Sequence, residues 1–286
     1  MESPDRLAWV TGAQGLIGNY LVQAAAQIAP SWRVRGLTRA QMDLLDFPAV
    51  AGEFKNDRPG LIIHCAAIAT IPGALANPEL AWRVNVEMTE ALLEMARDIS
   101  FVFLSTDLVF DGRKGNYAET DPVCPISLYG EMKAAAERSV LKSPRAMVVR
   151  TSINCGTSIS GSRGFNEQLR RDLRAGRTVR LFTDEIRSPI FAGETARACW
   201  ELAGKECAGI FHAAGAEKLS RWQIGQLLAE RSPEMKPMLQ PGSVGDFPGP
   251  PRARDTSLDI SKIQKLLSRP LPGLTEWLAA NPDEPI

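Results

Sequence analysis

The chain has few residues of the kinds that bind metals. It contains two histidines and five cysteines, and no two of the cysteines form a Cys-x-x-Cys pair. These counts argue against a zinc site or a histidine-rich metal centre, so we expect no metal. The odd number of cysteines, and an N-terminus without a basic and then apolar leader, favour a reducing, cytoplasmic location without disulfides.

Charge of one sign is not in excess either. Lys plus Arg and Asp plus Glu both number 33, so the formal net charge is zero. Without a basic field, nucleic acids and anionic membranes are not expected as partners. No apolar run approaches the roughly 20 residues that a membrane-spanning helix needs. Hydrophobic residues make up 44% of the 286-residue chain, which is ample for a buried core.

What the sequence does have is a glycine-rich turn near its start. Leu7–Val10 is typical of a buried parallel strand, and Leu16–Ile28 has the apolar spacing of a helix. Between them run Gly12, Gly15 and Gly18 in the spacing Gly-x-x-Gly-x-x-Gly. A strand, a glycine turn and a helix form the unit that binds a pyrophosphate on the helix N-terminus. We therefore expect a nucleotide-binding fold.

Strands and helices then alternate through the first half of the chain. Further strands are predicted at 33–38, 61–67, 101–107 and 146–150, and helices at 78–97 and 127–141. This order predicts an α/β fold, a Rossmann-type doubly wound parallel sheet with a smaller C-terminal α/β substrate lobe. Residues 1–151 are expected to form the dinucleotide-binding domain. Residues 152–286 are expected to form mainly the substrate-binding lobe, partly interleaved with the first domain.

The residues after the second predicted strand bear on the choice of cofactor. An NAD enzyme usually has an acid about 20 residues beyond the glycines. Here Thr38 and Arg39 occupy that region, and no acid precedes Asp43. A cation attracts a 2′-phosphate, so the sequence favours NADP(H) over NAD(H). The alternative is that Arg39 is an ordinary solvated residue, in which case NAD(H) stays open.

Tyr129 and Lys133 lie four residues apart at the start of a predicted helix and so share one face. A phenol ionises near pH ~10, and we expect the nearby ammonium to lower the tyrosine pKa. The pair can then pass a proton to or from a carbonyl or alcohol oxygen. Ser105 or Thr106, at the end of the preceding strand, can hydrogen-bond the same oxygen. His64 lies inside an apolar strand and is expected to be a core histidine.

Three segments together resemble the extended short-chain dehydrogenase/reductase superfamily, most closely its dTDP-4-dehydrorhamnose reductase family. They are Thr11-Gly-Ala-Gln-Gly-Leu-Ile-Gly18, Leu104-Ser-Thr-Asp-Leu-Val-Phe-Asp-Gly112 and Tyr129-Gly-Glu-Met-Lys133. The resemblance implies Thr106, Tyr129 and Lys133 as catalytic residues. The expected cofactor contacts are Gly12, Gln14, Gly15, Leu16, Ile17, Arg39, Asp43, Leu44, Cys65, Ala66, Ala67, Ser105, Tyr129 and Lys133.

The same resemblance implies a reaction and its substrate class. Hydride would pass from a reduced nicotinamide to the C4 ketone of a nucleotide-linked deoxysugar, and Tyr129 would protonate the oxygen. Asp107, Asn154 and Arg187 are the candidate substrate-binding residues. The family usually has an aromatic residue that helps to shape the sugar pocket, and this chain has Ser-Ile-Asn at residues 152–154 instead. The exact sugar therefore stays open. Arg187 either grips a phosphate or carboxylate or is an ordinary surface charge.

Two other functions fit the same residues. A nucleotide-sugar epimerase needs the same tyrosine and lysine, whereas a dehydratase is disfavoured because Leu108 replaces the expected acid after Asp107. Some relatives instead bind a dinucleotide as non-catalytic regulatory subunits. The helices at 78–97 and 127–141 commonly form a dimer interface in this superfamily, which implies a homodimer, although packing on the sheet explains their apolar faces equally well.

Overall fold

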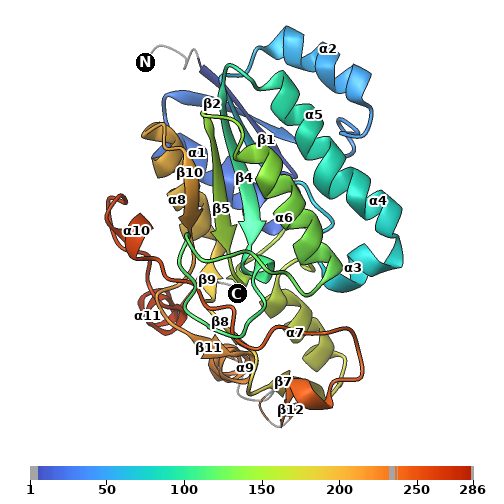
Figure 1. The fold of residues 1–286 in the computed structure, drawn as a ribbon. Coiled ribbons are helices and arrows are strands. Elements are labelled where there is room, and N and C mark those ends of the chain that lie inside the picture. The colour runs from blue at the N-terminus through green and yellow to red at the C-terminus, as the bar shows by residue number, and fades with distance from the viewer. Residues whose placement is uncertain (1–5, 232–235, 237, 285–286) are drawn as a thin grey trace.

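A six-stranded parallel sheet forms the centre of the computed structural model, which describes residues 6–231, 236 and 238–284. The strand order is β10-β5-β4-β3-β1-β2, and every pair is parallel (Figure 1). The strands are β1 (Arg6–Thr11), β2 (Trp32–Leu37), β3 (Leu61–His64), β4 (Ser100–Thr106), β5 (Ala146–Thr151) and β10 (Gly209–His212). The predicted doubly wound α/β fold is confirmed.

Helices cover both faces of the sheet, which is why its inner strands β1, β3, β4 and β5 are buried along nearly their whole length. α1 (Leu16–Ile28) and α8 (Ala192–Gly204) pack together over one face, in a cluster that includes Val10, Ile63 and Trp200. The other face carries α2 (Phe47–Asp57), α5 (Met88–Met95) and α6 (Leu128–Val140), whose cluster includes Trp9 and Phe101. Figure 1 shows these two layers on opposite sides of the strands.

The chain order produces a switch point in the sheet. After β1 the chain crosses to β2 at one edge and then returns to place β3 on the other side of β1. Connections therefore leave β1 and β3 in opposite directions, and their carboxyl ends bound the crevice where such folds bind ligands. The predicted glycine turn lies at this point. Among the described residues, no helix is long and apolar enough to cross a membrane.

The predicted helix at 78–97 is one continuous helical stretch with a wider turn in its middle. It consists of α4 (Pro78–Trp82), a π-helical turn (Arg83–Glu87) and α5. Such π turns interrupt the regular ladder and occur frequently at functional sites. Asn85, the polar residue among apolar neighbours, lies in this turn and is buried.

Smaller elements gather below the carboxyl ends of the strands (Figure 1). The short strand pairs are β6 (Asn154–Cys155) with β9 (Ile190–Phe191), β8 (Ile186–Arg187) with β11 (Leu219–Ser220), and β7 (Val179–Phe182) with β12 (Leu239–Gly242). The remaining α-helices are α3 (Ile71–Ala76), α7 (Phe165–Arg174), α9 (Arg221–Glu230), α10 (Ser261–Gln264) and α11 (Leu274–Ala280). Except for α3, these elements come from the second half of the sequence, and β10 and α8 from the same half complete the sheet and its cover.

Candidate active site

The glycine turn is held tightly against the end of β3. Gly12 has a left-handed φ of +68°, and a Cβ there would lie 2.7 Å from the Ala66 backbone nitrogen. The Thr11 hydroxyl accepts hydrogen bonds from the backbone N–H groups of Cys65 (3.1 Å) and Ala66 (3.2 Å). A Cβ on Gly18 would collide with the Gly12 carbonyl. The turn therefore needs glycine for its conformation and for the close approach of backbones.

The N-terminus of α1 opens directly from this turn. Its N-cap is Gly15, which has no side chain to satisfy the first N–H groups, and the first turn of α1 contains no acid. Free N–H groups and the positive end of the helix dipole suit an anion. Gln14 is exposed, and Gly15 and Ile17 are partly exposed, whereas Leu16 is buried. The residues present thus fit the pyrophosphate of a dinucleotide.

The segment after β2 contains both an exposed cation and residues that are fixed by protein contacts. Arg39 is exposed and has no ion-pair partner among the described side chains, so its charge is available to a ligand. The Asp43 carboxylate accepts from the Leu45 N–H (3.1 Å), and Leu44 is buried in the apolar layer beside α2. Asp46 caps α2 through the Ala49 N–H (3.1 Å). The roles of Arg39, Asp43 and Leu44 in cofactor binding stay predictions.

The tyrosine and lysine come together at the start of α6. Ser127 caps this helix through the Gly130 N–H (3.2 Å), which fixes its first turn. Tyr129 is 7% exposed and Lys133 is 3% exposed. The Lys133 ammonium lies 3.8 Å from the centre of the Phe103 ring. No described residue accepts a hydrogen bond from this ammonium, so its N–H groups are free for a ligand.

Burial dominates the protonation of both groups. It raises the pKa of the Tyr129 phenol well above its usual value, the Asp107 carboxylate raises it further, and a hydrogen bond with Thr106 opposes them. Burial also lowers the pKa of Lys133 to about 7, against the attraction of Glu137. The expected lowering of the tyrosine pKa is therefore wrong for the unliganded protein. The phenol keeps its proton at neutral pH, which makes it a proton donor.

Thr106 and Ser105 turn to different partners. The Thr106 hydroxyl accepts from the Leu108 N–H (3.2 Å) and lies at the phenol of Tyr129. The Ser105 hydroxyl donates to Glu137 (2.5 Å), one turn of α6 beyond Lys133. Of the two hydroxyls considered from the sequence, Thr106 is thus the one beside the phenol. Cys65, Ala66 and Ala67 are partly exposed at the end of β3.

His64 is a core histidine, as expected. Its Nδ1 lies 2.7 Å from the Thr11 hydroxyl and its Nε2 lies 3.2 Å from the Thr89 hydroxyl. Burial and the charge of Lys133 lower its pKa to about 3, so the ring is neutral at physiological pH. Through the Thr11 hydroxyl, His64 helps to stabilise the glycine turn.

The three candidate substrate residues all have protein partners. Asp107 accepts from Ser152 (2.8 Å) and Thr256 (3.0 Å). Arg187 is 3% exposed, so the surface-charge interpretation is wrong. The Asn154 amide donates to Thr151 (2.9 Å) and accepts from the Thr195 hydroxyl (2.7 Å). These contacts favour a positioning role, and direct substrate contacts of the three stay predictions.

The sequence interpretation missed the roles of Asn85 and Glu137. The Asn85 side chain accepts from the Ile68 N–H (2.8 Å) and donates to the Ile68 carbonyl (3.2 Å), which fixes the loop after Ala67. Glu137 holds Ser105 and forms an ion pair with Arg150 (2.7 Å). A buried polar residue among apolar ones, and a carboxylate four residues beyond Lys133, were the available signals.

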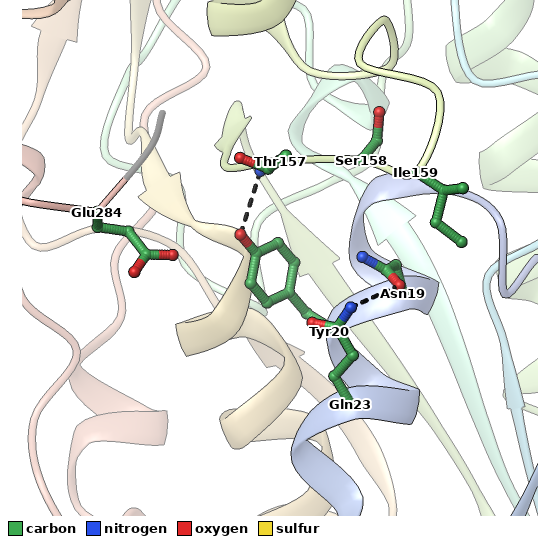
Figure 2. A pocket seen from close by; sticks show the side chains of 7 residues that line it. All are labelled: Asn19, Tyr20, Gln23, Thr157, Ser158, Ile159 and Glu284. Carbon is green, nitrogen blue, oxygen red and sulfur yellow. Dashed lines mark hydrogen bonds between the residues drawn. The ribbon is translucent and has the colours of Figure 1, made fainter.

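A pocket of about 350 Å³ lies on the outer side of α1, lined by seven residues that include Tyr20, Thr157 and Ser158. Figure 2 shows the Tyr20 hydroxyl accepting a hydrogen bond from the Thr157 N–H (3.1 Å). None of the predicted site residues lines this pocket. It shows instead that the loop after β6 runs beside α1.

Fold and site together define a Rossmann-type α/β protein of the extended short-chain dehydrogenase/reductase class. The family model described as RmlD substrate binding domain matches residues 7–282, and the chain belongs to this family. It is 32% identical over 288 residues to a probable low-salt glycan biosynthesis reductase of Haloferax volcanii, covering 96% of each protein.

Two further similarities are one to a protein sequence and one to a solved structure. The chain is 29% identical over 279 residues to the methionine adenosyltransferase 2 subunit beta of Xenopus laevis, covering 92% of this chain and 83% of that one. The dTDP-4-dehydrorhamnose reductase of Bacillus anthracis, solved in complex with NADP, superposes with a TM-score of 0.86 at 22% identity, covering 96% and 98%. This last similarity shows the fold.

Proposed function

We propose that the protein is an NADPH-dependent oxidoreductase that reduces a ketone, specifically the 4-keto group of a nucleotide-linked deoxysugar. The observation that carries the proposal is the buried pair of Tyr129 and Lys133 beside Thr106. The phenol keeps its proton, and the ammonium has no hydrogen-bond acceptor among the residues described. Similarity to a glycan biosynthesis reductase supports a sugar substrate.

The cofactor is assigned from the chain's own residues. The glycine turn and the uncapped N-terminus of α1 would receive the pyrophosphate, and Lys133 would hold the ribose hydroxyls. Arg39, exposed after β2, receives a 2′-phosphate, which favours NADPH over NADH. A bound reduced nicotinamide supplies the hydride for the carbonyl carbon.

The protein residues handle the proton. Thr106 and the Tyr129 phenol hydrogen-bond the carbonyl oxygen of the substrate and orient it. As negative charge develops on that oxygen, Tyr129 donates its proton, and the Lys133 ammonium stabilises the phenolate that remains. Solvent then returns a proton to Tyr129. Burial of Tyr129 and Lys133 lowers the local dielectric constant and so strengthens these interactions.

The test compares two tyrosine variants by the rate of NADPH oxidation with a panel of nucleotide-linked 4-keto sugars. Tyr129→Phe should keep NADPH affinity and lower kcat by about 10²–10⁴-fold, because the general acid is removed. Tyr20→Phe is the matched control, since it removes a phenol outside the site and should keep full activity. A fully active Tyr129→Phe enzyme would refute the proposal.

The similarity to methionine adenosyltransferase beta subunits supports a second candidate, a non-catalytic regulatory subunit that binds a dinucleotide. The same experiment separates the two functions. A regulatory subunit would bind NADPH, measured by fluorescence titration, and consume none with any keto sugar. Turnover that depends on Tyr129 would exclude this candidate.

A further inference from the structure

A buried carboxylate lies one turn of α6 beyond Lys133. Glu137 is 2% exposed, and because it follows Lys133 by four residues, the two side chains share one face of the helix. Its carboxylate accepts hydrogen bonds from the Ser105 hydroxyl (2.5 Å) and from Arg150 (2.7 and 3.0 Å). Glu137 therefore joins three elements of the fold, which are α6, the end of β4 and β5.

The contact with Ser105 reaches the proposed catalytic residues through the backbone. Ser105 directly precedes Thr106, whose hydroxyl lies at the phenol of Tyr129. A serine hydroxyl has a single proton to donate, and here Glu137 accepts it. This hydrogen bond holds the end of β4, which carries Thr106, against the helix that carries Tyr129 and Lys133.

Three titratable groups that face Lys133 are uncharged at neutral pH. Burial and the charge of Lys133 lower the pKa of His64, at the end of β3, to about 3. Burial raises the pKa of the neighbouring Cys65 thiol well above its usual range, and it also raises the pKa of the Tyr129 phenol. The imidazole, the thiol and the phenol therefore place no full charge beside the ammonium.

The charged residues of the elements packed on α6 are directed elsewhere. The π turn and α5 contact α6, and their charged residues are all exposed, namely Arg83, Glu87, Glu90 and Glu94. α3 and β4 carry no charged side chain. The Asp107 carboxylate, in the turn after β4, raises the pKa of Tyr129, and Arg150 of β5 is paired with Glu137. Within the described chain, Glu137 is thus the buried carboxylate that acts on Lys133.

The charge of Glu137 opposes the effect of burial on Lys133. Burial lowers the pKa of Lys133 to about 7, the Glu137 carboxylate raises it, and Cys65 would add to this only as a thiolate. A nearby opposite charge favours the ionised form of a group. Because this pKa lies near 7, the charged fraction of Lys133 at neutral pH depends steeply on that neighbour. The proposed reaction needs the charged form, since the ammonium stabilises the Tyr129 phenolate.

We propose that Glu137 is a positioning residue for ketone reduction, which keeps the Lys133 ammonium charged and, through Ser105, holds the end of β4 beside it. Arg150 balances the buried carboxylate. Because Ser105 and Arg150 occupy the carboxylate oxygens, the N–H groups of Lys133 stay free for a ligand. This inference deepens the proposed function and rests on it for the reaction that uses the charge.

The charge of Lys133 can be measured directly by ¹³C NMR of the full-length protein labelled at lysine. The Cε resonance that is lost in Lys133→Met identifies the residue, and its chemical shift is followed against pH. Glu137→Gln keeps the size of the side chain and removes its charge. It should lower the midpoint of the Lys133 titration by about one pH unit or more, because an attractive charge is lost and Arg150 is left unbalanced.

Further variants separate the charge of Glu137 from its packing. Glu137→Asp keeps a carboxylate and should bring the midpoint back toward the wild-type value. Glu131→Gln is the matched control, because it removes an exposed carboxylate from the same helix, and it should move the midpoint by less than about 0.3 pH unit. If thermal melting shows that Glu137→Gln does not fold, the double variant Glu137→Leu, Arg150→Met removes both charges and should still lower the midpoint.

The same shift should appear in catalysis. kcat for NADPH-dependent ketone reduction should fall as the pH rises through the titration of Lys133, and in Glu137→Gln this fall should begin at a lower pH by a similar amount. A purely structural role of Glu137 would lower kcat at every pH and leave the position of the fall unchanged.

An unchanged midpoint in Glu137→Gln, or an equal change in Glu131→Gln, would overturn the inference. A shifted midpoint in a protein that reduces no keto sugar would contradict the proposed function and leave the effect of Glu137 on Lys133 standing. Ketone reduction with the same pH dependence in wild type and Glu137→Gln would contradict this inference alone.

Discussion

Two buried cations beside each other in the fold are in opposite circumstances. Lys133, on α6, has an aromatic ring for a neighbour and a pKa lowered to about 7. Arg150, on β5, donates to Glu137 of α6 at 2.7 and 3.0 Å, and the side chains of Arg150 and Glu137 are at most 3% exposed. The paired charge of Arg150 has a structural role, because its partners are all protein groups. The unpaired charge supports the proposed site, because a buried cation without a protein acceptor can be stabilised by a ligand.

Removing the paired cation should have the largest effect on stability. Arg150→Met leaves Glu137 buried without its partner and should lower the free energy of unfolding by about 3–5 kcal/mol. Urea denaturation monitored by tryptophan fluorescence measures this. As a control, the double variant Arg150→Met, Glu137→Leu removes both charges and should recover much of the loss. A loss below about 1 kcal/mol in the single variant would mean that the pair is not effectively buried.

Replacing the unpaired cation, Lys133, should have the opposite effect on the free energy of unfolding, and this effect should depend on pH. Because burial lowers the pKa of Lys133 to about 7 from 10.5, the unfolded chain binds more protons between these values. Wild type should therefore gain about 2 kcal/mol of stability relative to Lys133→Met between pH 7 and pH 9. Below about pH 6 the difference should be constant, because Lys133 is protonated in both the folded and the unfolded state. A difference that stays flat from pH 7 to pH 9 would contradict the lowered pKa.

An exposed, unpaired cation completes the comparison with the smallest effect on stability. Arg39→Asp should change the free energy of unfolding by less than about 0.5 kcal/mol. It should weaken NADPH binding about tenfold or more and leave NADH binding nearly unchanged, because only NADPH carries the 2′-phosphate. The control is Arg33→Asp, which replaces an exposed arginine on β2. Equal weakening of both cofactors would remove the basis for the NADPH preference.

The contrast also explains how much of the site could be predicted. Tyr129 and Lys133 are four residues apart on one helix, so their shared face follows from local geometry alone. Arg187 was ambiguous because its partners come from distant segments, with the Ala253 carbonyl 66 residues further along. The predicted direction of the shift in the Tyr129 pKa was wrong for a related reason. Burial, which depends on the whole fold, and the Asp107 carboxylate raise this pKa, and the opposing effect comes from a hydrogen bond with Thr106.

The sequence by itself determined the layered α/β fold, the glycine turn at Gly12 and the start of α6. Each depends on backbone conformation or on the periodicity of apolar residues within a short stretch. Only the tertiary structure decided that Ser105 holds Glu137 while Thr106 meets the phenol, and that Glu185 gathers three arginines. Those outcomes depend on which groups lose water together, and that is set when distant segments pack.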